Sequence, residues 1–350
     1  MINISMKWKA WYGNETLAVK LPKEWDINRY STKPLPIMTD KEIRESILSP
    51  LGSEPLHREI KGKKTVCIAV DDITKPTETF RIAPFILDEL IKGGIKKENI
   101  YFLVSLGTHR ALSLPDLKKK LGADIALNYR VYNHNPYQNN KYIGDTRRGT
   151  KLYINNLFLE ADYKIAIGML MPHNLAGFSG GGKIVLPGLA SIETVEENHR
   201  SSLRGLQGKI GSLKDNHVRA DIEEAARKAG LDFIVNSVHG ETGETVKLFS
   251  GNLEEAYPLA VQEAVKIYSC KPTYNNDIGI FNAFPRDLWF LLSLSSLDVW
   301  STRDKNKEIV KPRGSIVIIN NCSEGAGGEH GLHGKGMKHY VMRDEHGTIK

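Results

Sequence analysis

The fold of this chain is decided by the segment YKIAIGML at residues 163–170 and by the loop HNLAGFSGGGK at residues 173–183 that follows it. The first segment is a continuous apolar run, which is typical of a strand buried on both faces of a parallel sheet. The loop contains glycines at 177 and 180–182 and ends in Lys183. Because glycine has no Cβ, backbone N–H groups in such a loop can approach an anion closely. The sequence therefore predicts an α/β domain that binds a phosphorylated ligand at this loop.

The same loop resembles a nucleotide-binding P-loop. Gly177, followed after four residues by Gly182-Lys183, matches the first seven positions of that pattern, but Ile184 stands where a Ser or Thr would bind Mg²⁺. Three alternatives stay open at this point. The protein is a P-loop-like ATPase or kinase, or it is a phosphate- or nucleotide-binding protein that uses the Gly177–Lys183 loop without covalent chemistry. In the third alternative the glycines only permit close packing in a tight strand-to-helix turn.

Length and composition indicate an ordinary globular protein. A chain of 350 residues is long for one hydrophobic core and favours two α/β domains. The net charge of +7 is dispersed, which favours small anionic ligands and argues against nucleic acid as a partner. The basic clusters at 61–64 and 118–120 are interpreted as solvated faces.

The cysteines and the apolar runs bear on the location of the protein. Cys67, Cys270 and Cys322 lie far apart with no C-x-x-C spacing, which argues against a structural zinc site and favours a reducing compartment. The N-terminus lacks the apolar segment of a signal peptide, and no run is long enough to span a bilayer. We expect a soluble, cytoplasmic protein with no membrane partner.

Apolar runs alternate with helical periodicity, which indicates a mainly parallel sheet flanked by helices. Strands are expected at 65–70, 100–106, 163–170 and 233–238. Helices are expected at 39–48, 79–92, 114–121, 191–199, 218–229 and 253–267. The opening residues 2–35 are expected to form a short hairpin that packs on the main domain.

Two domains are predicted, each a mainly parallel sheet flanked by helices, with the active site in the interdomain cleft. The N-terminal cofactor-binding domain covers 1–270, a linker covers 271–276, and the C-terminal domain covers 277–350. In the second domain we expect strands at 277–281 and 315–319 and a helix at 286–298. Two clear strands are few for such a domain, which leaves open that the chain continues beyond Lys350. A Gly-rich segment at 323–336, with Glu329, His330 and His333, is interpreted as a lid or interface loop rather than a second metal site.

Polar side chains follow three of the predicted strands. Asp72 and Lys75 follow the first, His109 and Arg110 follow the second, and the loop from His173 to Lys183 follows the third. Ligands of open α/β sheets bind beyond the carboxyl ends of the strands, so these groups are expected to share one crevice. Two histidines that flank one carbon centre suit a racemase or epimerase, because each face of the centre needs its own acid or base. A third histidine, such as His199, could bind a metal through a neutral imidazole nitrogen.

These residues resemble the nickel-pincer lactate racemase family over about residues 10–330. The motifs that carry the resemblance are Asp71 to Thr77, Gly107 to Arg110, AGFSGGGKIVLPG at 176–188, and Asn198-His199. The resemblance implies a cofactor, pyridinium-3,5-bisthiocarboxylic acid mononucleotide, that is joined to Lys183 by a thioamide and holds nickel with His199. The cofactor-binding residues that it implies are Lys183, Ser179, Gly180, Gly181, Gly182 and Asp72. Sulfur and carbon donors together with one imidazole suit square-planar nickel.

The resemblance also implies the reaction, which is racemisation or epimerisation of a 2-hydroxy acid by reversible removal of a proton and a hydride at C2. His109 and His173 would be the acid/base pair, and Asp72 would orient a histidine or contact the cofactor. The implied partners are the small-molecule substrate and the enzymes that make the cofactor.

The substrate-binding positions depart from the family. Lys75 replaces the arginine of the lactate enzymes, and a point charge lacks the bidentate fork for a carboxylate. After Phe284-Pro285-Arg286-Asp287, Leu292 and Ser295 replace the glutamine and lysine of those enzymes. Losing a buried charge partner costs several kcal/mol in binding of the same ligand. We therefore expect the best substrate to be not lactate but a hydroxy acid with a larger or more apolar side chain, or a sugar acid. The expected substrate-binding residues are Lys75, Arg110, Arg286, Leu292 and Ser295.

Overall fold

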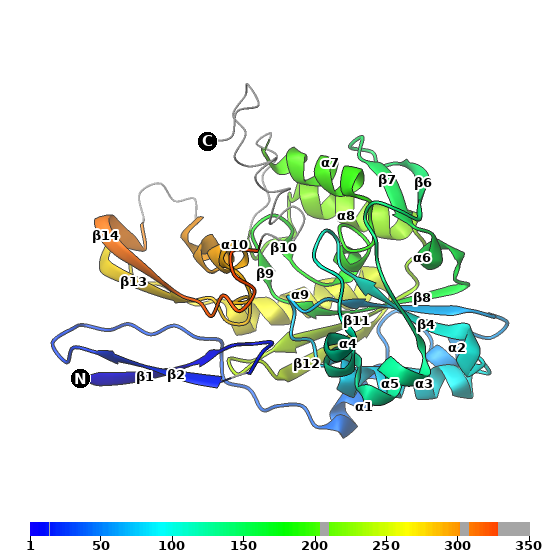
Figure 1. Ribbon diagram of the computed structural model, residues 1–350, viewed down its shortest axis with the longest axis horizontal. Coiled ribbons are helices and arrows are strands. Elements are labelled where there is room, and N and C mark those ends of the chain that lie inside the picture. The colour runs from blue at the N-terminus through cyan, green and yellow to red at the C-terminus, as the bar shows by residue number, and fades with distance from the viewer. Residues whose placement is uncertain (14, 204–209, 302–307, 328–350) are drawn as a thin grey trace. The chain divides into compact units, whose positions relative to one another are not determined.

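The computed structural model describes residues 1–13, 15–203, 210–301 and 308–327, and it divides into two compact units (Figure 1). The larger unit contains Leu35–Gly240 and Glu244–Val265. The other contains Met1–Pro34, Glu241–Gly243 and the chain from Lys266 onward. The predicted lid segment at 323–336, with Glu329, His330 and His333, lies outside the described residues from position 328 onward.

The larger unit is built on one six-stranded sheet with the order β12-β11-β8-β3-β4-β5. Five neighbouring strands run parallel, and β12 is antiparallel to β11. The bounds are β3 Val66–Asp71, β4 Ile100–Ser105, β5 Arg130–Asn133, β8 Tyr163–Leu170, β11 Phe233–His239 and β12 Thr245–Gly251. Every residue of β3, β4, β8 and β11 is buried, as the continuous apolar runs predicted. The mainly parallel α/β fold is therefore confirmed.

Helices flank this sheet. They are α1 Asp40–Leu48, α2 Leu56–Glu59, α3 Thr79–Lys92, α4 Leu114–Leu121, α5 Ala123–Asn128, α6 Asn156–Glu160, α7 Ile192–Leu203, α8 His217–Lys228 and α9 Leu253–Tyr268. Local capping signals fix some of their starts. Thr39 with Glu42 and Ser113 with Asp116 each form a capping box, in which side chain and backbone satisfy each other's free N–H groups. The helices expected from periodicity are all present in this unit.

Short antiparallel pairs complete the larger unit. The sequence predicted neither strand of the pair formed by β6 (Asn140–Asp145) and β7 (Lys151–Asn155), and it did not predict β12. The pair of β9 (Pro172–His173) and β10 (Gly177–Phe178) lies inside the glycine loop. It is followed by the 3-10 turn η2 at Gly181–Ile184. The loop that decides the fold therefore has regular structure of its own.

The second unit contains two separate two-stranded sheets. The hairpin of β1 (Ile2–Trp8) and β2 (Glu15–Leu21) was expected. The prediction that it packs on the main domain was wrong, because the hairpin belongs to the second unit. Its turn binds this unit instead, because the backbone N–H groups of Lys9 and Ala10 donate to the Asp287 carboxylate at 2.7 and 3.2 Å. The domain boundaries drawn at 271–276 stay a prediction.

The parallel pair of β13 (Asn276–Asn282) and β14 (Val310–Ile319) confirms the two strands expected in this region. The helix expected at 286–298 was wrong in its first half. In its place are the single turn α10 (Phe290–Ser293) and the 3-10 helix η3 (Leu294–Ser301). Trp289 is extended, and the O atoms of Asp287 and Leu288 accept from Cys322 and Glu324 N–H groups. These long-range bonds prevent the helical pattern from starting at residue 286.

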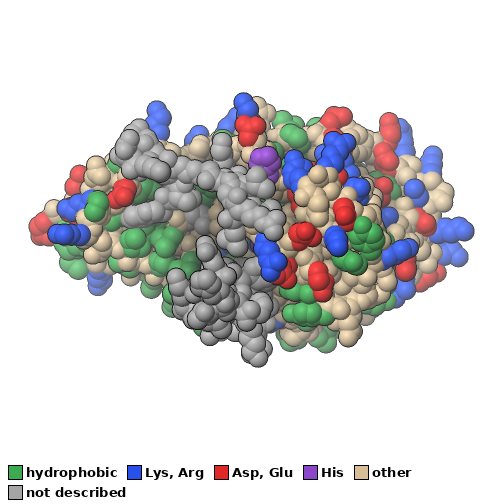
Figure 2. Space-filling view, turned by 90° about the horizontal axis from the view of Figure 1, so that it is seen from above, with side chains coloured by type: hydrophobic (Ala, Val, Ile, Leu, Met, Phe, Trp, Pro, Cys, Tyr) green, Lys and Arg blue, Asp and Glu red, His purple; other side chains and the backbone are tan. Residues whose placement is uncertain are grey.

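Among the described residues, no helix has both the length and the apolar character that a bilayer crossing needs. On the face drawn in Figure 2, Lys and Arg side chains are interspersed with Asp and Glu rather than gathered in one patch. The expected cytoplasmic location stays a prediction.

Candidate active site

The carboxyl ends of β3, β4 and β8 lie side by side in the sheet, because β3 is the central strand of the three. Asp71 at the end of β3 pairs with Ser105 at the end of β4, and Val70 pairs with Ile167 of β8. The three polar loops that follow these strands therefore begin at one edge of the sheet. This convergence is the arrangement that the sequence predicted from the strand ends.

His109 is held by Asp72. Its Nδ1 lies 2.5 Å from Asp72 Oδ2, and Asp72 Oδ1 accepts from Thr74 N at 3.0 Å and Thr74 Oγ1 at 2.5 Å. Burial by itself would raise the pKa of Asp72, but the charge and hydrogen bond of His109, with the charge of Lys75, lower it overall. The buried carboxylate is therefore ionised, and it directs the Nδ1–H of His109 toward itself. In the neutral ring this tautomer places the basic lone pair of His109 on Nε2.

His173 is held from both sides by its own loop. Its Nδ1 accepts from Leu175 N and Ala176 N, each at 3.2 Å, and its Nε2 lies 3.2 Å from Lys183 Nζ. A ring nitrogen that accepts two N–H groups carries no proton, so the neutral ring carries its proton on Nε2.

His199 lies on α7 and is partly exposed. Its Nδ1–H donates to Val195 O at 2.9 Å, which places the lone pair of the neutral ring on Nε2. Burial lowers the pKa of His199 to about 4, and the nearby charges of Lys183 and His109 also lower it, against the effect of the Val195 carbonyl. The imidazole is therefore neutral at pH 7. The charges of Lys183 and His109 therefore act on His199, although the three residues come from different loops and helices.

The glycine turn at 180–182 is packed against protein. Gly180 and Gly181 have φ of 72° and 55°, and a Cβ at Gly181 would lie 2.5 Å from the Tyr257 ring. Gly181 N donates to the buried Asn236 Oδ1 at 2.9 Å. Ser179 Oγ donates to Met169 O at 2.6 Å, which joins the turn to β8. Close packing accounts for these residues, so their contact with a phosphate stays a prediction.

The two basic residues next to the histidines differ. Lys75 Nζ donates to Thr74 Oγ1 at 3.0 Å, beside the Asp72 carboxylate. The Nη1 of Arg110 donates to Asp116 Oδ2 at 2.8 Å and to Ala111 O at 3.0 Å. Lys75 therefore lies beside the carboxylate that holds His109, whereas the Arg110 guanidinium is bound to the start of α4.

The other predicted substrate residues belong to the second unit. Leu292 is 1% exposed, and Ser295 Oγ donates to Leu292 O at 2.7 Å. Arg286 N donates to Ala283 O at 2.7 Å in the turn before α10. The structure thus gives Leu292 and Ser295 internal roles, and their contact with a substrate stays a prediction.

Sequence reasoning missed two buried cations that support the site. Lys120 was interpreted as part of a solvated cluster, but its side chain is fully buried and donates to Asp71 Oδ1 at 2.6 Å. This reading was wrong because Lys120 follows Leu117 by three residues and precedes Leu121, which places it on the apolar face of α4. Arg219 of α8 is 3% exposed and donates to Ala176 O at 3.1 Å and to Phe178 O, inside the glycine loop.

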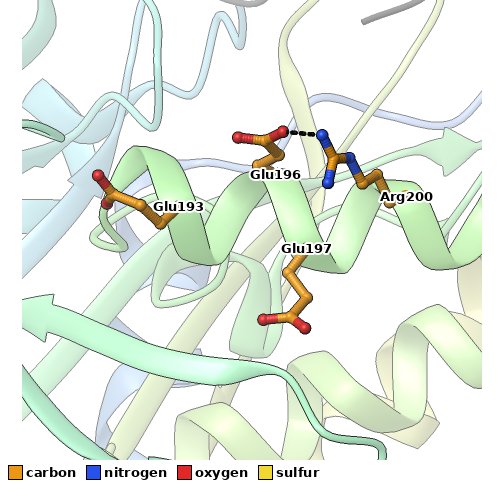
Figure 3. A pocket seen from close by; sticks show the side chains of 4 residues that line it. All are labelled: Glu193, Glu196, Glu197 and Arg200. Carbon is orange, nitrogen blue, oxygen red and sulfur yellow. Dashed lines mark ion pairs between the residues drawn. The ribbon is translucent and has the colours of Figure 1, made fainter.

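A separate pocket of about 260 Å³ lies along α7 (Figure 3). It is lined by Glu193, Glu196, Glu197 and Arg200, and Arg200 forms an ion pair with Glu196. None of the predicted site residues lines it. Its acidic lining does not suit an anionic hydroxy acid, so this pocket is not our candidate site.

Comparison with known proteins gives consistent matches. A family model described as the lactate racemase N-terminal domain matches residues 12–210. The chain is 31% identical to the lactate racemase of Thermoanaerobacterium thermosaccharolyticum over 331 residues, which cover 91% of this chain and 75% of that protein. It is 31% identical to the lactate racemase of Lactiplantibacillus plantarum over 296 residues, which cover 83% of this chain and 68% of that protein.

Solved structures agree with the sequence matches. The lactate racemase apoprotein from T. thermosaccharolyticum superposes with a TM-score of 0.78 at 30% identity, covering 94% of this chain and 76% of that one. A protein from Thermotoga maritima gives a TM-score of 0.57 at 24% identity, covering 72% of this chain and 64% of that one, which shows a shared fold only.

Proposed function

The chain belongs to the lactate racemase family and is an isomerase of the racemase class, and from this premise we propose that it racemises or epimerises a 2-hydroxy acid with a nickel-pincer nucleotide tethered to Lys183. The observation that supports the proposal is that two contacts, each between a histidine and a charged residue, lie in loops that start at one edge of the sheet. One pair is His109 with Asp72, and the other is His173 with Lys183.

The residues present fit the proposed cofactor. The primary amine of Lys183 is the group that a thioamide link requires, and its Nζ lies 3.2 Å from His173 Nε2. The Nε2 lone pair of His199 is the donor that a soft divalent metal such as nickel binds. Lys183 would therefore hold the organic part, and His199 would hold the metal. When bound, this cofactor supplies an acceptor for the hydride of the C2 carbon.

The chain's own residues supply the proton transfers in this proposal. His109 Nε2 and His173 Nε2 would serve as the acid and base for the substrate hydroxyl, one for each enantiomer. Asp72 would keep the His109 ring oriented and stabilise its protonated form, because the lowered pKa of the carboxyl keeps it ionised throughout the reaction. These steps explain why the site contains two histidines with different partners.

We propose Lys75 as the group that receives the substrate carboxylate. Its ammonium lies beside Thr74 and Asp72, whereas the candidate Arg110 is paired with Asp116. A single ammonium contacts a carboxylate as a point charge and gives less orientation than a guanidinium fork. This weaker orientation is a reason to expect a substrate other than lactate, such as a hydroxy acid with a larger or more apolar side chain, or a sugar acid.

A panel of enantiopure 2-hydroxy acids tests the substrate. The protein is produced together with the cofactor-making enzymes, and the loss of enantiomeric excess is followed by chiral chromatography. We expect a bulkier acid to give a higher kcat/KM than lactate. Lactate as the best substrate would reject the substrate assignment, and no racemisation of any acid would reject the reaction.

Intact mass tests the cofactor. Wild-type protein and the exposed-lysine control Lys118→Met are expected to carry a mass increment and nickel, whereas Lys183→Ala carries neither. An unmodified wild-type protein that binds phosphate would instead support a phosphate- or nucleotide-binding protein. Mg²⁺-dependent ATP hydrolysis would support the P-loop alternative, which Ile184 and the packed glycine turn disfavour.

A further inference from the structure

We propose that Lys120 is a positioning residue, which holds the turn that carries Asp72 and Lys75 and thereby orients His109. The inference rests on the proposed function for its consequence in catalysis. Its structural part, the orientation of the His109 ring, can be measured without any turnover.

The contacts of Lys120 join its ammonium to three acceptors at the start of the turn. Its side chain is fully buried, and Nζ donates to Asp71 Oδ1 at 2.6 Å, to Lys75 O at 2.8 Å and to Asp72 O at 3.2 Å. An ammonium has three N–H donors, so each has one acceptor here. Lys120 therefore fixes the backbone carbonyls of both functional residues at once.

Asp71 extends this support to the neighbouring strand. Its second oxygen, Oδ2, accepts from Thr77 Oγ1 at 2.6 Å and from Met169 N at 2.9 Å. Met169 lies at the end of β8, just before the loop that contains His173. The ion pair thus joins α4 to the ends of β3 and β8, from which the two histidine loops start.

The turn passes this restraint on to His109. Asp72 O also accepts from Lys75 N at 3.3 Å, and Asp72 Oδ1 is held by Thr74. These bonds leave Asp72 Oδ2 pointing at His109 Nδ1. A change in the path of the turn would move the carboxylate and with it the imidazole ring.

The cost of burying charge supports a role in geometry rather than stability. A buried ion pair is desolvated on both sides, and replacing both partners by apolar groups is often neutral or stabilising. Stability alone is therefore a weak reason for a charged pair here. An apolar pair could not bind the three oxygen atoms that Lys120 holds, which are Asp71 Oδ1, Asp72 O and Lys75 O.

The test compares Lys120→Met with Lys118→Met, which removes the same charge from an exposed position of the same helix. The nitrogen and Cε1 NMR shifts of the His109 ring are measured in full-length protein made without the cofactor-making enzymes, and kcat/KM is measured in the loaded enzyme. We expect Lys120→Met to shift the His109 signals and to lower kcat/KM by about 10–100-fold, the usual cost of losing a supporting partner. We expect Lys118→Met to change neither. Unchanged signals and unchanged kcat/KM in folded Lys120→Met would overturn the proposal.

A double variant separates positioning from charge compensation, because Lys120→Met alone leaves Asp71 as an unpaired buried charge. Asp71→Asn with Lys120→Met removes both charges and keeps an acceptor for Thr77 and Met169. We expect this variant to regain thermal stability while His109 stays displaced and kcat/KM stays low. If thermal stability, the His109 signals and kcat/KM all recover, or if both variants fail to fold, Lys120 has a role in stability and the positioning role is rejected. A wild-type protein that racemises no hydroxy acid would reject the proposed function, and the NMR comparison would still decide the role of Lys120.

Discussion

Burial is the main reason that the pKa values of His134 and His199 are both lowered to about 4, but the two rings differ in their other partners. His134 is 3% exposed, its Nε2–H donates to Ala190 O at 3.0 Å, and its Nδ1 accepts from Asn155 Nδ2 at 3.0 Å. Burial lowers the pKa of His134 to about 4, against the effect of the Ala190 carbonyl. His199 reaches about 4 through burial and the charges of Lys183 and His109.

The difference teaches how to recognise a functional histidine in this fold. Both ring nitrogens of His134 are bonded to the protein core, so its neutral form is simply that of a satisfied buried side chain. His199 donates from Nδ1 to its own helix, and the charges that contribute to its lowered pKa are those of the site residues Lys183 and His109. A lowered pKa alone does not distinguish the two histidines, whereas the charged side chains that contribute to it do.

The largest expected effect comes from replacing the proposed metal ligand, His199, and comparing the result with replacement of the buried His134. His199→Ala should abolish racemisation and nickel retention, because the proposed metal ligand is lost, and it should leave the fold intact. His134→Gln should retain nickel and activity while lowering the melting temperature. Nickel content by mass spectrometry and the chiral assay measure both. Nickel retained by His199→Ala would remove His199 from the metal site.

A large effect is also expected from Asp72→Asn, which removes the carboxylate that holds the ring of His109. Loss of an orienting carboxylate lowers kcat by about 10²–10⁴-fold, because the imidazole loses its correct tautomer and the stabilisation of its charged form. The matched control is Asp88→Asn at an exposed position of α3. Activity equal to the control would show that His109 works without Asp72.

A moderate effect is expected on acid stability. The folded pKa of His134 is about 4 against an ordinary 6.5, so between these values the unfolded chain binds a proton that the native chain does not. Stability should therefore fall as pH decreases from 6.5 to 4, by about 3 kcal/mol for His134 and by less for the partly exposed His199.

Denaturant unfolding of cofactor-free protein at pH 7 and pH 4.5 measures this fall. The loss of unfolding free energy between the two pH values should decrease more in His134→Gln than in His199→Gln. Equal or reversed losses would show that the burial of the two rings is not what separates them.

The smallest effect is expected from Lys75→Arg, which changes the proposed carboxylate-binding residue of the candidate site. A guanidinium can bind a small carboxylate with two hydrogen bonds, so the preference for lactate over the best substrate should rise several-fold, on the order of 1 kcal/mol. His199 and its nickel should be unaffected. The ratio of the two kcat/KM values measures the change, and an unchanged ratio would mean that Lys75 does not contact the carboxylate.

Much of the candidate site was predictable because it depends on strand ends. The apolar runs of β3, β4 and β8 predicted parallel buried strands, and their carboxyl ends predicted that Asp72, His109 and His173 would meet. The helix at 286–298 failed because bonds to residues 322 and 324 override local periodicity. The second unit also includes the opening hairpin, through Asp287, which no local pattern indicates.

By itself, the sequence determined the order of the long buried strands and the helices that flank them, the loops that carry reactive side chains and the family to which they belong. These follow from periodicity and short motifs, which are local properties of the chain. Only the tertiary structure decided which nitrogen of each histidine carries its proton, that the glycine turn is packed against Tyr257, and that Lys120 is buried beneath Asp71. The last two facts depend on contacts between residues 49 or more positions apart, and the free energy of such contacts is set by packing and desolvation rather than by neighbouring residues.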